Sequence, residues 1–161
     1  MKISKVCISL ILYLGYAALL YAENNNLDDI SDIHTRALEL NRWLQKDELV
    51  EMLTAFNRVS TLAEKATTDI VKEELLKEDA EIKLYNSFKE IKSNVESLLA
   101  DKKYNEALDA FATLKPLVDN LFDNVMVMDK DEAIKENRLG LLKQIYSTML
   151  TICDLSKIVY K

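Results

Sequence analysis

The 161-residue chain carries 21 lysines and arginines against 27 aspartates and glutamates, which gives a formal net charge of −6. This balance argues against a protein that binds nucleic acid through charge alone, because such proteins neutralise phosphates with a broadly basic surface. It leaves room for a local basic patch. With two glycines and one proline in the whole chain, the composition predicts helices and not a sheet, and the length suits one domain.

Reactive side chains are scarce. His34 is the only histidine, and Cys7 and Cys153 are the only cysteines, a set too small for a zinc site of cysteines and histidines. The sequence also lacks a glycine-rich phosphate loop and a nucleophile elbow. We therefore predict no metal site and no catalytic residue in this chain, which leaves open whether it belongs to an enzyme.

The first 22 residues allow two interpretations. Two lysines precede an apolar run from Val6 to Ala22, and polar ENNN follows. This order is typical of a secretory signal cleaved after Ala22, although Leu20 occupies a position where signal peptidase prefers a small side chain. The alternative is an apolar N-terminal helix, residues 1–22, buried under the rest of the fold and making no membrane contact. Cleavage would mean an exported protein.

Apolar residues recur at three- and four-residue steps in two segments of the N-terminal half, as in amphipathic helices. The first segment runs from Leu27 to Leu44. The second follows a predicted cap at Asp47 and carries its apolar stripe from Leu49 to Ala63. Residues 70–76 have a weak pattern and are predicted to form a helical turn or loop.

The C-terminal half shows the same period. A long helix is predicted from about Glu78 to Ala100, with Ile82 on its inner face, and a last helix is predicted to begin at a cap provided by Asp129 or Asp131. The expected fold is all-α, an antiparallel bundle of five or six helices with short connections.

Between these two helices, a further apolar stripe runs from Leu108 to Val125 and contains Pro116. Proline has no N–H and cannot complete the hydrogen bonds of a helix interior. The helix is therefore predicted to kink or divide near Thr113.

The most specific pattern of the chain lies between Leu114 and Ile158. It reads Pro-Leu-Val-Asp, Phe-Asp-x-Val-Met-Val-Met, an acidic turn, Asn-Arg-Leu-x-Leu-Leu and Asp-Leu-Ser. This order resembles the C-terminal end of bacterial glycyl-tRNA synthetase β subunits, in the helical domain of the DALR anticodon-binding type. The residues that carry it are Pro116, Val118, Asp119, Phe122, Asp123, Val125, Met126, Val127, Met128, Asp129, Asp131, Asn137, Arg138, Leu139, Leu141, Leu142, Asp154, Leu155 and Ser156.

Upstream, Ala55, Arg58, Val59 and Ser60 resemble a helix of the same family, with Asn57 where the family has a lysine. The resemblance implies that residues 23–161 form a DALR-type helical domain that binds glycine tRNA at its anticodon. A separate catalytic α subunit would use ATP and magnesium to attach glycine, so this chain would need no cofactor of its own.

By the same resemblance, the partners are glycine tRNA, the synthetase α subunit and the rest of the β subunit, and the location is the cytoplasm. The alternative is an exported helical-bundle module that binds other proteins through its surface.

Candidate RNA contacts are the cations of the predicted helices, because phosphates attract them. Scattered cations on amphipathic helices more often form only a solvated face. The candidates are Arg36, Arg42, Arg58 and Lys65 in the N-terminal half, and Lys135 and Lys143 on the last helix.

Several other side chains are predicted to have structural roles. Arg138 is expected to pair with Asp119 or Asp123 across the last two helices, with Asn137 completing a hydrogen-bonded cluster. Met126 and Met128 are expected to fill gaps in the core or between helices, not to form a ligand site. Trp43 is expected to pack at a helix end, although its ring could also stack on a base.

Overall fold

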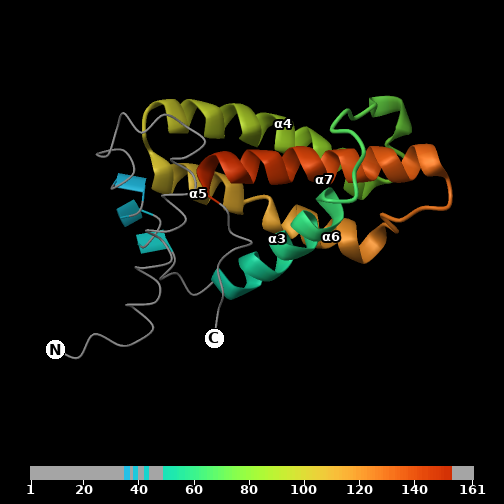
Figure 1. Ribbon diagram of the computed structural model, residues 1–161, viewed down its shortest axis with the longest axis horizontal. Coiled ribbons are helices and arrows are strands. Elements are labelled where there is room, and N and C mark those ends of the chain that lie inside the picture. The colour runs from blue at the N-terminus through green and yellow to red at the C-terminus, as the bar shows by residue number, and fades with distance from the viewer. Residues whose placement is uncertain (1–34, 37, 40–41, 44–48, 154–161) are drawn as a thin grey trace. The chain divides into compact units, whose positions relative to one another are not determined.

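The computed structural model describes residues 35–36, 38–39, 42–43 and 49–153 (Figure 1). The chain divides into two units, Met1–Lys46 and Asp47–Lys161. In the first unit, the described residues are helical. The apolar segment 1–22, its boundary with residue 23 and the predicted cap at Asp47 lie outside the described residues.

The second unit is built from α-helices and one short 3-10 helix (Figure 1). The described residues contain no β-strand, so the predicted all-α fold is confirmed. Among them, no helix is both long and apolar enough to cross a membrane. The elements are α3 (Leu49–Ala63), η1 (Glu73–Leu75), α4 (Asp79–Ala100), α5 (Tyr104–Ala112), α6 (Lys115–Asn124) and α7 (Glu132–Ile152).

Helix α7 is the element on which the second unit is assembled. It packs against α3, α4 and α5, and it also contacts η1 (Figure 1). Helix α6 packs instead against α3 and α4. Asp131 caps α7 as predicted, because its Oδ1 accepts hydrogen bonds from the backbone N–H groups of Ala133 (2.9 Å) and Ile134 (3.3 Å).

The predicted division of the helix near Thr113 is confirmed. Helix α5 ends at Ala112 and α6 begins at Lys115, with Pro116 in the first turn of α6. The first N–H groups of a helix have no partner within that helix, so a residue without an N–H costs nothing there.

The core lies where α3, α5 and α7 meet and continues along α4. Phe56 of α3 and Phe111 of α5 are fully buried, and their ring centroids are 4.9 Å apart. The other large, fully buried side chains are Phe88, Leu84, Leu108, Leu114, Leu121, Leu139, Leu141, Leu142, Ile145 and Met149.

Two predictions about the core are wrong. Ile82 is 38% exposed, because Glu81 and Leu84 face inward at the start of α4. Met126 and Met128 are also exposed, at 72% and 45%. After α6 the backbone becomes extended at Val125, so successive side chains alternate between inside and outside.

Candidate functional site

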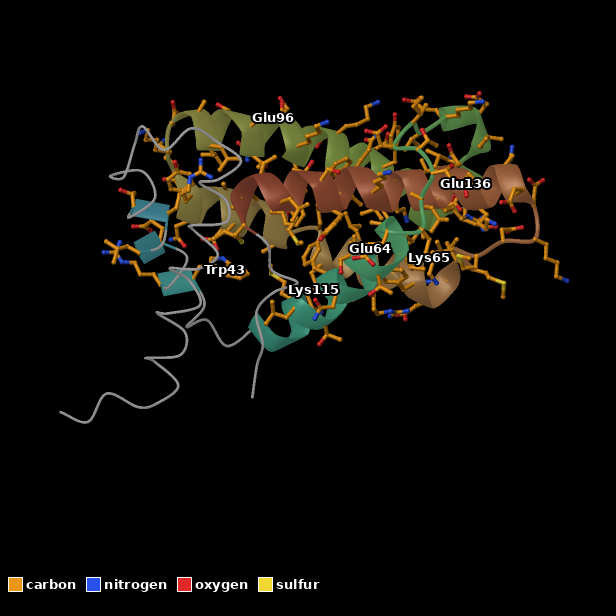
Figure 2. All side chains as sticks on the ribbon, viewed as in Figure 1. Trp43, Glu64, Lys65, Glu96, Lys115 and Glu136 are labelled. Atoms are coloured by element: carbon orange, nitrogen blue, oxygen red, sulfur yellow. The ribbon has the colours of Figure 1, made fainter. Side chains whose placement is uncertain are left out.

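Two of the predicted RNA contacts, on α3 and in the turn after it, have side chains that form no ion pair or hydrogen bond with other described residues. Arg58 lies on α3 and is exposed, and its Cζ is 4.1 Å from the centroid of the Phe122 ring on α6. Lys65, labelled in Figure 2, is exposed in the turn that follows α3. Its side chain has no hydrogen bond or ion pair within the described part of the chain. These two cations are therefore available to a ligand.

The two candidate lysines of α7 are engaged within the protein. Lys143 donates to the backbone oxygen of Ala66 at 3.2 Å, and Lys135 pairs with Glu132 at 2.6 Å on the same helix. Both side chains are partly buried. Binding RNA through either lysine would require breaking these contacts, so the structure favours the α3 surface.

The remaining candidates belong to the first unit. The guanidinium of Arg42 is 2.6 Å from Glu39, three residues earlier, and Arg36 is half-buried. The Trp43 side chain is buried, with 3% of its surface exposed. Burial agrees with the predicted packing role and removes the ring from contact with a base.

The predicted pairing of Arg138 with Asp119 or Asp123 is wrong. Its Nε donates to Oε1 of Glu81, and its Nη1 donates to Oδ2 of Asp129 at 2.7 Å. Asp119 instead accepts a hydrogen bond from Lys115 of its own helix, and Asp123 is exposed. Because α6 packs on α3 and α4, its carboxylates do not face the Arg138 side of α7.

Glu81 could not be selected from its place in the sequence, since a glutamate on an amphipathic helix usually faces solvent. Glu81 has no exposed surface, and Arg138 is 5% exposed. The second oxygen of the Glu81 carboxylate accepts the N–H groups of Lys77 (2.7 Å) and Glu78 (3.2 Å). Arg138 also donates to the backbone oxygen of Met126 at 2.9 Å. This cluster joins the start of α4 to the α6–α7 connection.

Asn137 also has a different partner from the one predicted. Its Oδ1 accepts the N–H of Lys72 at 2.7 Å, and its Nδ2 donates to the oxygen of the same residue at 3.1 Å. Gly140, one turn later, faces the same segment: a Cβ there would be 3.0 Å from the oxygen of Ile70. The Asn-Arg-Leu motif and the glycine after it thus hold loops against α7.

Glu136 holds the beginning of the same loop and should make stability depend on pH. Hydrogen bonds from the side chain and the backbone N–H of Thr67, at 2.5 and 3.3 Å, hold the pKa of Glu136 below its ordinary 4.5 (Figure 2). A carboxylate with a lowered pKa in the folded state stabilises the fold above its unfolded pKa, and this stabilisation is lost as pH falls through the folded pKa. We expect Glu136→Gln to destabilise the fold at pH 7, by an amount that shrinks as the pH is lowered below about 4.5.

Urea denaturation at several pH values measures this difference. The matched control is Glu96→Gln, because Glu96 of α4 is exposed and has no side-chain partner within the described part of the chain (Figure 2). A Glu136→Gln effect that stays constant from pH 7 to about pH 3 would show that the Thr67 contact does not distinguish the charged from the neutral carboxyl group.

Comparisons with known proteins agree with this structure. The model of the DALR anticodon binding domain family matches residues 52–160. The glycine–tRNA ligase beta subunit of Clostridioides difficile is 72% identical over 138 residues, which are 86% of this chain and 20% of that protein. The corresponding subunit of Desulforamulus reducens is 40% identical over 132 residues, which are 82% of this chain and 19% of that protein.

The chain spans about a fifth of the length of the curated relatives it matches. The family match alone covers more than half of the chain and falls on the second unit, from α3 through the end of α7. The chain belongs to the DALR anticodon-binding domain family.

Proposed function

We propose that this chain is a tRNA-binding module of a glycine–tRNA ligase β subunit and that it holds glycine tRNA at the anticodon arm. The observation that carries this proposal is the 72% identity over 138 residues with a protein named as that subunit. The family match points to the same role. Attachment of glycine, with ATP and magnesium, is assigned to the α subunit.

The exposed surface of α3 supports the proposal. It presents Arg58, and Lys65 follows in the next turn. Asn57 is exposed on the same helix, and its side-chain amide can form hydrogen bonds with sugar, phosphate or base. Because the whole chain is acidic, binding must depend on such a local group of cations, and its affinity should fall as salt is raised.

The proposal includes partners and a location. The rest of the β subunit and the α subunit would complete the synthetase, and the assembly would act in the cytoplasm, where amino acids are attached to tRNA. The family match does not favour the alternative, an exported module for protein interactions.

Titration of glycine tRNA with the full chain over about 50 to 200 mM salt tests the proposal. We expect the logarithm of the affinity to fall linearly with the logarithm of the salt concentration. Lys65→Ala should weaken binding and reduce the magnitude of that slope by about one, because one phosphate contact is lost.

Lys92→Ala is the matched control, since Lys92 of α4 is exposed and has no side-chain partner within the described residues. We expect it to leave the slope unchanged. Absence of tRNA binding at about 50 mM salt, or an affinity that does not respond to salt, would overturn the proposed function.

A further inference from the structure

We propose that Arg58, positioned over the Phe122 ring, is a stacking platform for one unpaired base of a bound RNA. This inference rests on the proposed function and extends it, because it assigns to one residue a kind of contact that a surface cation alone does not make. The geometry that carries it is the distance of 4.1 Å between Cζ of Arg58 and the centroid of the Phe122 ring.

The ring is the only partner that the structure gives to the Arg58 side chain within the described residues. An arginine on a helix surface usually pairs with a carboxylate three or four residues away. Around Arg58 those positions hold Thr54, Ala55, Thr61 and Leu62, none of which is acidic. No carboxylate on the neighbouring turns of α3 can therefore draw the guanidinium away from the Phe122 ring.

The two residues come from different helices that pack against each other, α3 and α6. Phe122 is half-buried, whereas Arg58 is exposed. A ring held in the surface of the fold limits the positions open to the guanidinium above it, so less side-chain freedom is lost when a ligand binds. The guanidinium is thus placed in advance, with surface open to solvent.

A guanidinium group is planar and delocalised, and it can contact an aromatic ring with one face and a base with the other. Proteins that read single-stranded RNA stack unpaired bases on aromatic rings or on arginine planes. A lysine at the same position would keep the charge and lose the plane. Replacement of Arg58 by lysine therefore distinguishes base stacking, which needs the plane, from attraction to a phosphate, which needs only the charge.

Two hydrogen-bonding side chains flank the pair in the sequence. Asn57 precedes Arg58 on α3, and Asp123 follows Phe122 on α6; both are exposed, and neither side chain has a partner within the described residues. An amide offers both donors and acceptors, and a carboxylate accepts from the amino group of a base. Groups of this kind, next to the pair in the sequence, can form hydrogen bonds with a base edge, and the Asp123 carboxylate would repel a phosphate that approached it.

Titration of glycine tRNA with full-length variants at constant salt tests the inference. We expect Arg58→Lys to weaken binding by about tenfold, because it removes the stacking plane, and Arg58→Ala to weaken it further, because it also removes the charge. Arg58→Lys should keep the salt slope of the wild type, since the charge remains. Phe122→Leu should weaken binding less, because it removes the support and leaves the guanidinium.

A second readout detects stacking directly. An anticodon stem-loop of glycine tRNA carries the fluorescent base 2-aminopurine at each loop position in turn, and its emission changes when the stacking of that base changes. The wild-type chain should change the emission at one position, and Arg58→Lys should abolish that change at saturating protein.

The outcomes separate the two proposals. If the wild type binds tRNA but Arg58→Lys binds as tightly, the stacking inference is overturned and the proposed function stands. A change of emission with Arg58→Lys equal to that with the wild type would also overturn the inference. If the wild type does not bind tRNA at all, the proposed function fails and the inference fails with it.

Discussion

Replacement of Arg138 by alanine is expected to lower the free energy of unfolding by about 3–5 kcal/mol. Arg138 is 5% exposed and its partner Glu81 is completely buried, so the variant would leave a carboxylate in the core without its cationic partner. The hydrogen bonds from Arg138 to Asp129 and to the backbone oxygen of Met126 would also be lost. Urea denaturation followed by circular dichroism measures the change.

A double variant shows whether charge is the cause. In Arg138→Ala combined with Glu81→Gln, no unpaired charge is buried, so we expect part of the stability to return. Lys135→Ala on the same helix is the control, because its pair with the exposed Glu132 should contribute less than about 1 kcal/mol. A loss below about 1 kcal/mol for Arg138→Ala would contradict the importance of this cluster.

Replacement of Phe111 by alanine should have an effect of similar size, about 3–5 kcal/mol. Its ring is fully buried and lies 4.9 Å from that of Phe56, so the variant removes both apolar burial and the contact between α3 and α5. This loss is a large share of the 5–15 kcal/mol that stabilises a typical domain. Denaturation in urea should show a much lower midpoint.

The matched control for Phe111 is an apolar residue outside the core. Ile70 is 65% exposed, so Ile70→Ala should change stability by less than about 0.5 kcal/mol. If Phe111→Ala and Ile70→Ala had equal effects, the stability of the second unit would not depend on packing between α3 and α5.

Much of the fold could be predicted because the spacing of apolar residues and the positions of proline and capping residues can be recognised in the sequence. The apolar stripe of α3 marks the side that is buried, and Pro116 marks the start of α6 through its missing N–H. Asp129 and Asp131 could be identified as candidate caps because a short acidic side chain before an apolar stripe often accepts backbone N–H groups, and the structure shows Asp131 in that role.

The partners of buried polar groups could not be predicted in this way. Glu81 looks like any surface glutamate in the sequence, and only the packing of α7 on α4 places it beside Arg138. Helical spacing shows which residues share a face of one helix, but it does not show which carboxylate of another helix lies opposite. Asp119 and Asp123 were therefore reasonable candidates for Arg138 and were wrong.

The candidate site, too, could be predicted only in part: the sequence shows which residues are cations, but not which partners they have. The sequence identifies Arg58 and Lys65 as cations. It does not show that Lys143 of α7 donates to the backbone oxygen of Ala66, whereas the Lys65 side chain has no partner among the described residues. It also gives no sign that Phe122 lies under Arg58, because these residues are far apart in the chain and meet only where α6 packs on α3.

Residues of the pattern between Leu114 and Ile158 have two different roles in the structure. Asn137 and Arg138 act inside the protein, where they hold the Lys72 segment and the start of α4. Phe122 supports an exposed cation. Variants of Asn137 or Arg138 should therefore lose tRNA binding only to the extent that they unfold, whereas variants of Arg58 should lose it while remaining folded.

Ribonuclease footprinting of glycine tRNA in complex with the full chain is the most direct test of the proposed role. Binding through an anticodon-binding domain predicts protection of nucleotides in the anticodon arm, with weaker protection when Arg58 is replaced by lysine. Protection confined to the acceptor arm would contradict the assignment, as would a footprint that appears equally on unrelated tRNAs.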